Sequence, residues 1–133
     1  MVALTEVIRI PCTLDATHDL RLAIRTLCER AGVEREGTDD LLLAVTEATT
    51  NAILYGCPMG GDIELRWKSD GDCTEVEIED NGVFRKRIPM PELDESRGRG
   101  IPLMLALMNE VHIQQGTRRH PGTVVRLVKC SAR

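Results

Sequence analysis

The sequence predicts a two-layer α/β sandwich, in which a mixed, mainly antiparallel sheet carries helices on one face. Three observations support this fold class. Strand and helix patterns follow one another in the order β-α-α-β-β-loop-α-β-β. Hairpin turns make neighbouring strands antiparallel, and three helices are too few to cover both faces of a small sheet. The length of 133 residues fits one domain, covering residues 1–133.

Alternating apolar and polar residues define the strands, and apolar residues at helical spacing define the helices. Gly32 is expected to end the first helix, and Gly56 with Pro58 the second. Residues 70–72 (Asp-Gly-Asp) separate two alternating runs and predict a hairpin turn. The predicted elements are a strand at 6–12, a helix from Asp15 or Thr17 to about Ala31, a helix from a cap at Thr38 or Asp39 to about Tyr55, strands at 62–68 and 73–80, a helix at 101–109, and strands at 111–116 and 123–129.

Residues 83–97 follow no clean period, contain two prolines and many charges, and predict a long loop. Loops of this length in a compact domain are commonly lids or binding segments, so we expect a mobile lid here. The strand at 62–68 carries charged residues on one side and apolar residues, including Trp67, on the other. One face of the sheet is therefore expected to be polar and open.

Composition excludes several function classes. The hydrophobic fraction of 42% and the charged fraction of 29% are ordinary for a globular protein. The three aromatic residues are too few for base-stacking platforms, and a net charge of −4 with only short basic runs predicts no direct nucleic-acid binding. The longest nearly apolar run, Ile101 to Met108, is too short to span a membrane, and the first residues do not resemble a signal peptide. We expect a cytoplasmic protein without membrane attachment.

The cysteine pattern also favours the cytoplasm. The five cysteines are Cys12, Cys28, Cys57, Cys73 and Cys130. None forms a Cys-x-x-Cys pair, and no histidine lies at metal-ligand spacing from any of them. An odd number at irregular spacing predicts free thiols in a reduced, cytosolic protein.

Glu47 and Asn51 lie one turn apart in the second predicted helix, so their side chains project from the same face. A carboxylate beside an amide suits a general base next to a Mg²⁺ ligand. The pair lies off the most apolar stripe of that helix. Taken alone, it is equally compatible with a polar helix face turned to solvent.

Three later signals are compatible with a nucleotide. Asp80 continues the apolar side of its strand, where a lone carboxylate is costly, so it is either a buried acceptor for a ligand amino group or the start of a turn. Thr123 faces inward at a strand start and either completes a purine patch or is an ordinary strand threonine. The Gly98-Arg99-Gly100 turn opens an apolar run, where helix N–H groups bind phosphate, or is only a loop. The order and spacing of all these signals favour a nucleotide site.

These segments resemble the motifs of a known group of proteins. Residues 43–52 (Leu-Ala-Val-Thr-Glu-Ala-Thr-Thr-Asn-Ala) resemble the N-box of the GHKL ATP-binding superfamily. Residues 80–82 (Asp-Asn-Gly) resemble its adenine-binding box, residues 98–101 its phosphate-loop glycines and residues 122–123 (Gly-Thr) its last box. The compact length and the opening strand and helix look most like the RsbW-type anti-sigma-factor serine kinases. The resemblance covers nearly the whole chain and implies the GHKL, or histidine-kinase-like, ATPase fold.

The resemblance implies ATP and Mg²⁺ as cofactors. Glu47 matches the general base that acts on a serine of a partner protein, and Asn51 matches the Mg²⁺ ligand. Asp80 matches the residue that binds the adenine amino group, while Arg97 and Arg99 are alternative matches to the γ-phosphate contact. The implied nucleotide-binding positions are Asn51, Asp80, Gly82, Arg97, Gly98, Arg99, Gly100, Ile101 and Thr123.

The function implied by the resemblance is an ATP-dependent serine-protein kinase and anti-sigma factor that phosphorylates an STAS-domain anti-anti-sigma partner in a partner-switching pathway. A sigma factor is a further implied partner, and members of the family are commonly homodimers. The alternative is a non-catalytic ATP-binding module that binds a sigma factor or activates a phosphatase by contact. The carboxylate of Glu47 favours the kinase. A histidine kinase is disfavoured, because no helix pair with a phosphoacceptor histidine precedes the ATP-binding motifs.

Overall fold

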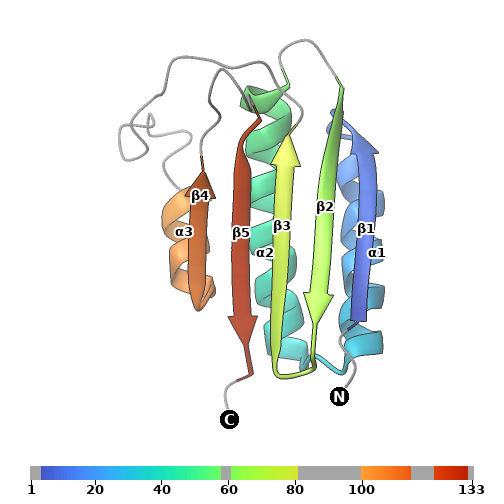
Figure 1. Ribbon diagram of the computed structural model, residues 1–133, viewed down its shortest axis with the longest axis vertical. Coiled ribbons are helices and arrows are strands. Elements are labelled where there is room, and N and C mark those ends of the chain that lie inside the picture. Colours follow the sequence, from blue (N-terminus) through green and yellow to red (C-terminus); the bar gives the residue numbers. More distant parts are fainter. Residues whose placement is uncertain (1–3, 58–60, 81–99, 115–121, 132–133) are drawn as a thin grey trace.

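The computed structural model describes residues 4–57, 61–80, 100–114 and 122–131. Five strands form one sheet in the order β1-β2-β3-β5-β4, and the helices pack on one of its faces (Figure 1). The elements are β1 (Leu4–Pro11), α1 (Ala16–Ala31), α2 (Arg35–Asn51), the π-helical segment η1 (Ala52–Gly56), β2 (Asp62–Ser69), β3 (Cys73–Asp80), α3 (Gly100–Leu107), β4 (Glu110–Gln114) and β5 (Val124–Cys130). Their order is the predicted one, which confirms the fold class, and all the strand pairings are antiparallel.

The core lies between the sheet and the helices. Along β3, buried and half-buried residues alternate, and Thr74, Val76, Ile78 and Asp80 take the buried positions. Trp67 of β2 is fully buried on the same side of the sheet. This alternation is the one predicted from the sequence, because each strand of a half-covered sheet turns every second side chain to the core.

The other sheet face is open and charged, as predicted. A row of three glutamates runs along β3, and one arginine from each of the two neighbouring strands forms ion pairs with them. Arg66 of β2 pairs with Glu77 and Glu79, at 3.6 and 3.0 Å respectively, and Arg126 of β5 pairs with Glu75. Like charges along one strand face repel one another. The two arginines reduce this repulsion among the three glutamates of β3.

The helix boundaries correct two predicted caps. Thr38 and Asp39 lie inside α2, which already begins at Arg35, with Glu34 as its N-terminal cap residue. Thr38 is 7% exposed and its N–H donates to the Glu34 carbonyl at 2.9 Å, so it is part of the first helical turn. Gly32 ends α1 as predicted, at a left-handed φ of 77° that glycine adopts without strain.

The predicted free thiols are wrong for four of the five cysteines. Cys12 is bonded to Cys57, and Cys73 is bonded to Cys130. Cys28 remains a buried free thiol. Sequence spacing missed both bonds because each joins residues 45 or 57 positions apart. Strand register brings Cys73 to Cys130, and the packing of α2 and η1 on the sheet brings Cys57 to Cys12.

Some predictions fall on segments without a description. The proposed lid at residues 83–97 lies outside the described residues, and so do both short basic runs. The strands predicted at 111–116 and 123–129 are observed as β4 and β5 with shifted ends. No helix in the described part of the chain is long and apolar enough to cross a membrane.

Candidate functional site

The predicted site residues gather at one end of the sheet. β3 ends there with Asp80, β5 begins there after Thr123, and α3 begins there with Gly100 (Figure 1). The carboxyl-terminal end of α2, which carries Asn51, reaches the same end, and the following segment η1 contacts β3. Four segments that are far apart in the sequence are therefore neighbours in space.

Asp80 and Thr123 form the best-defined part of this end. Asp80 is 6% exposed, and its carboxylate Oδ1 accepts a hydrogen bond from the Thr123 backbone N–H at 3.2 Å. The Asp80 N–H in turn donates to the Thr123 carbonyl at 3.1 Å. These two hydrogen bonds hold Asp80 and Thr123 side by side at the end of the buried side of β3. The carboxylate is thus held in one orientation, as a buried acceptor must be.

Gly122 makes this arrangement possible and was missing from the predicted site residues. A Cβ atom at this position would overlap the main-chain carbonyl oxygen of Asp80. Only glycine permits the two backbones to approach so closely without displacing the end of β3. The Gly-Thr pair in the sequence was the available signal, since a glycine just before a strand commonly marks such an approach.

Glu47 and Asn51 lie on the flank of α2 that turns away from the buried stripe, and both are half-buried. Asp40 lies on the same flank, seven positions before Glu47, and its carboxylate pairs with Lys129 of β5 at 2.9 Å. Lys129 also donates to the Leu107 carbonyl at the end of α3, at 2.7 Å. The flank that carries Glu47 and Asn51 therefore faces the side of the molecule where β5 and α3 lie.

Neither the Glu47 nor the Asn51 side chain makes a hydrogen bond or ion pair with any residue that the structure describes. Most polar atoms at intermediate burial find partners in the protein or in water. Exposed leucines lie on the same helix face, Leu43 at 44% and Leu54 at 53% exposure. A half-buried carboxylate and amide that have no partner among the described residues are suited to bind a ligand.

The positions predicted to bind phosphate are only partly described. Gly100 is the first residue of α3, and Ile101 follows it inside the helix. The helix start that was predicted for the glycine turn is therefore present. Gly82, Arg97, Gly98 and Arg99 lie outside the described residues.

Comparison with known proteins identifies the group to which this fold and site belong. The sequence profile of the histidine kinase-like ATPase domain matches residues 10–129. The chain belongs to this family. The matched range contains Glu47, Asn51, Asp80 and Thr123, so all the described side-chain positions of the predicted site lie within it.

Similarity within the histidine kinase-like ATPases points to one type of member. The chain is 27% identical to the serine-protein kinase RsbW of Bacillus subtilis, over 91% of this chain and 82% of that protein. It is 25% identical to RsbW of Halalkalibacterium halodurans, over 90% of this chain and 79% of that protein. The predicted RsbW-like resemblance is thereby confirmed.

A solved structure supports the fold. The RsbU and RsbW domains of Rv1364c from Mycobacterium tuberculosis match 96% of this chain with a TM-score of 0.70 at 17% sequence identity. This chain spans about a third (32%) of that longer one. The likeness therefore shows the histidine kinase-like fold.

The donor groups of the site fit a nucleotide with Mg²⁺. Asp80 offers a buried, oriented carboxylate acceptor, and Asn51 offers an amide oxygen, a kind of ligand that Mg²⁺ prefers. No cluster of three or more acidic, histidine or cysteine side chains suitable for a metal occurs among the described residues. This is compatible with Mg²⁺, which is usually held by one or two protein groups together with phosphate oxygens and water.

Proposed function

We propose that this chain is an ATP-dependent serine-protein kinase and anti-sigma factor that phosphorylates an STAS-domain anti-anti-sigma protein. The observation that carries the proposal is the position of Glu47 and Asn51, half-buried and without protein partners in the described structure, on a helix that contacts β3, the strand that ends at Asp80. Similarity to serine-protein kinase RsbW along 91% of the chain favours serine-kinase chemistry within this ATPase family.

In this proposal the adenine ring is recognised at Asp80. The carboxylate accepts a hydrogen bond from the exocyclic amino group, and the Thr123 N–H keeps the carboxylate in place through its bond to Oδ1. The Thr123 side chain completes the polar patch, directly or through water. A hydrogen bond to a charged acceptor in a buried position contributes about 1.5–3 kcal/mol.

The phosphates are proposed to lie at the start of α3. Gly100 and Ile101 are the first two residues of α3. The backbone N–H groups at a helix start bind anions because they have no partners within the helix. The remaining contacts in the proposal come from positions outside the described residues, namely Gly82, Arg97, Gly98 and Arg99.

Asn51 is proposed to hold Mg²⁺ through its amide oxygen, and Glu47 to act as the general base. When bound, Mg-ATP supplies the γ-phosphoryl group with its charge partly neutralised. The Glu47 carboxylate orients the serine hydroxyl of the partner protein and takes its proton. Leu43 and Leu54 lie exposed on the same helix face, so a protein substrate can approach Glu47 from this side.

The wider setting belongs to the same proposal. The chain acts as a single kinase domain over residues 1–133, as a homodimer in the cytoplasm, in a partner-switching pathway. Phosphorylation of the STAS protein releases it, and the kinase is then free to bind a sigma factor. No direct contact with nucleic acid or membrane is part of the proposal.

The test is a phosphate-transfer assay with the full chain, Mg-ATP and a panel of STAS-domain proteins from the same genome. We expect a phosphoserine on one of them, detected by mass spectrometry, and nucleotide binding in a parallel calorimetric titration. Nucleotide binding without transfer to any STAS protein would contradict the kinase and favour the non-catalytic ATP-binding module. Absence of nucleotide binding would contradict both.

A further inference from the structure

The two disulfides lie at opposite ends of the sheet. Cys12 follows the last residue of β1, and the strand register places that end of β1 level with Asp80: Pro11 pairs with Asp62, and Ile63 pairs with Asp80. The Cys12–Cys57 bond therefore belongs to the end that carries the candidate nucleotide site. Cys73–Cys130 lies at the other end, roughly 23 Å away along β3 at about 3.3 Å per residue.

We propose that Cys12–Cys57 is a reversible thiol–disulfide site that sets the order of η1 and, through it, the affinity for nucleotide. The part that concerns nucleotide rests on the proposed function. The part that concerns the order of η1 stands on the position of the bond alone.

The connection to η1 is direct. Cys57 is the residue immediately after η1, and η1 continues α2 from Asn51 without a break. η1 also contacts β3, the strand that ends at Asp80. The disulfide thus fixes the far end of the segment that joins the two halves of the candidate site.

When the Cys12–Cys57 bond is broken, only noncovalent contacts still hold the end of η1 in place. The Cys12 N–H still donates to the Gly61 carbonyl at 2.9 Å, and Cys57 is still 7% exposed within the core. The covalent link that closes 45 residues is lost, however, and η1 gains conformational freedom. Nucleotide binding to the reduced protein then has to order η1, and the loss of conformational entropy lowers the affinity for nucleotide.

The bond is open to exchange from one side. Cys12 is half-buried, whereas Cys57 is 7% exposed. Because a thiolate must reach the sulfur that it attacks, the accessible sulfur is that of Cys12. An external dithiol protein or a small dithiol is the matching reductant.

A thiolate of the dithiol attacks Sγ of Cys12, the S–S bond breaks, and its electron pair leaves on Sγ of Cys57, which takes a proton. The second thiol of the reductant then displaces Cys12 as a thiol. In total two electrons and two protons pass to the protein, and the dithiol becomes a disulfide. A small-molecule disulfide such as glutathione disulfide drives the reverse reaction.

The other cysteines supply internal controls. Cys28 is fully buried, and burial raises the pKa of its thiol to about 11, against the opposing effect of a hydrogen bond with Thr38. It is therefore a poor nucleophile at neutral pH. Cys73–Cys130 joins two strands that are already paired by backbone hydrogen bonds, far from η1.

The experiment compares oxidised and reduced full-length protein in glutathione buffers of defined ratio. Three proteins are used: wild type, the C12S/C57S pair and the matched C73S/C130S pair. Affinity for Mg-ADP is measured by calorimetry, and amide hydrogen exchange of residues 52–57 is measured without nucleotide. Thiol alkylation followed by mass spectrometry reports which cysteines are bonded.

We expect reduction of the wild type to weaken Mg-ADP binding at least about fivefold, the lower end of usual coupling between sites, and to speed exchange in residues 52–57. C73S/C130S should keep both responses, and C12S/C57S should resemble the reduced protein in both buffers. Equal exchange of residues 52–57 in oxidised and reduced wild type, or complete alkylation of Cys12 in the oxidised protein, would overturn the proposal. If C12S/C57S fails to fold, the wild-type comparison still decides. Absence of Mg-ADP binding in every sample contradicts the proposed function, while the exchange measurement still tests the disulfide.

Discussion

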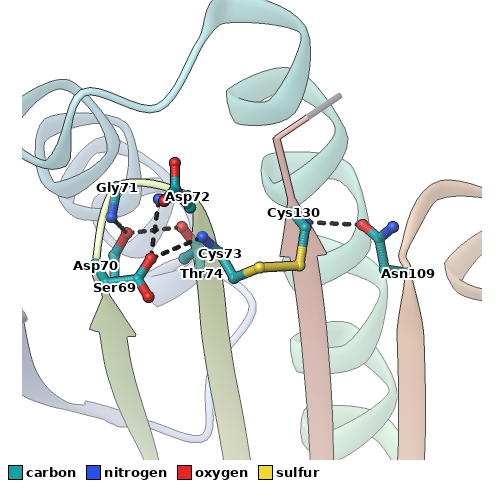
Figure 2. The surroundings of a disulfide bond; sticks show 8 residues. All are labelled: Ser69, Asp70, Gly71, Asp72, Cys73, Thr74, Asn109 and Cys130. Carbon is teal, nitrogen blue, oxygen red and sulfur yellow. Dashed lines mark hydrogen bonds between the residues drawn. A yellow bond between two sulfur atoms is a disulfide. The ribbon is translucent and has the colours of Figure 1, made fainter. Parts of the chain in front are cut away.

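The two ends of the sheet are built in different ways. At the hairpin end, the turn between β2 and β3 is held by local hydrogen bonds: Asp70 Oδ1 accepts from the N–H groups of Asp72 and Cys73, both at 2.9 Å. Figure 2 shows these bonds beside the Cys73–Cys130 disulfide, which joins β3 to β5. The side chains shown at this end form bonds within the chain.

The opposite end brings together residues from four separate elements, and some of them have no partner in the part of the chain that the structure describes. Thr123 and Asp80 are 43 positions apart and hydrogen-bond to each other, while Glu47 and Asn51 have no bonded partner among the described residues. In the proposed function, nucleotide binding takes place at this end of the strands, and the hairpin end has no part in it. Mutations at the two ends should therefore affect different measurements.

The largest expected effect is at Glu47. Glu47→Ala removes the proposed base and should lower phosphate transfer to an STAS partner by about 10²–10⁴-fold, while nucleotide binding stays close to wild type. The assay is phosphoserine formation under single-turnover conditions. Glu36→Ala removes an exposed carboxylate from the other end of the same helix and serves as control. Equal activity of the Glu47 and Glu36 variants would show that the base has been misassigned.

The second effect concerns stability at the hairpin end. Replacing Cys73 and Cys130 together with serine should lower the free energy of unfolding by about 2–4 kcal/mol, because the link between residues 57 positions apart constrains the unfolded chain. Affinity for Mg-ADP should not change. Urea denaturation and calorimetry measure the two quantities. A drop in affinity larger than the drop in folded fraction would mean that the two ends are coupled.

The third effect is specific to binding. Asp80→Asn keeps the shape of the side chain but weakens the acceptor for the adenine amino group, and affinity for adenine nucleotides should fall roughly tenfold or more, from the loss of about 1.5–3 kcal/mol. Glu79→Gln is the matched control, since Glu79 is the neighbouring residue on the open face and pairs with Arg66. Unchanged affinity in Asp80→Asn would sink the adenine assignment.

The smallest expected effect is on stability, and it is tested by comparing alanine substitutions at two glycines. Gly122→Ala places a Cβ against the Asp80 carbonyl, so the end of β3 must shift, at about 1–3 kcal/mol of stability and with weaker nucleotide binding. Gly37→Ala, inside α2 near the hairpin end, places a Cβ 3.2 Å from Val33 Cγ1 and 3.7 Å from Glu34 Cγ, without backbone overlap, and should be neutral or stabilising because alanine favours the helix. Thermal unfolding and calorimetry distinguish them. The same response at both positions would contradict the contrast between the ends.

Much of the fold was predictable from local sequence. The alternation in β2 and β3, the turn at residues 70–72 and the stop at Gly32 each depend on neighbouring residues, and the structure confirms them. The start of α2 was misplaced because Thr38 is a good cap residue by type but is buried in the first turn. Which sheet face is covered also followed from the pattern, since the charged side of β2 has no apolar partner to pack against.

The sequence alone determined the strand and helix periods, the family motifs and the position of Asp80 on an apolar face. Tertiary structure alone decided the two disulfides, the approach of Gly122 to Asp80 and the flank to which Glu47 and Asn51 turn. The physical reason is range. Periodicity and turns are set by interactions within a few residues, whereas these three features depend on strand register and helix packing between segments that are dozens of residues apart.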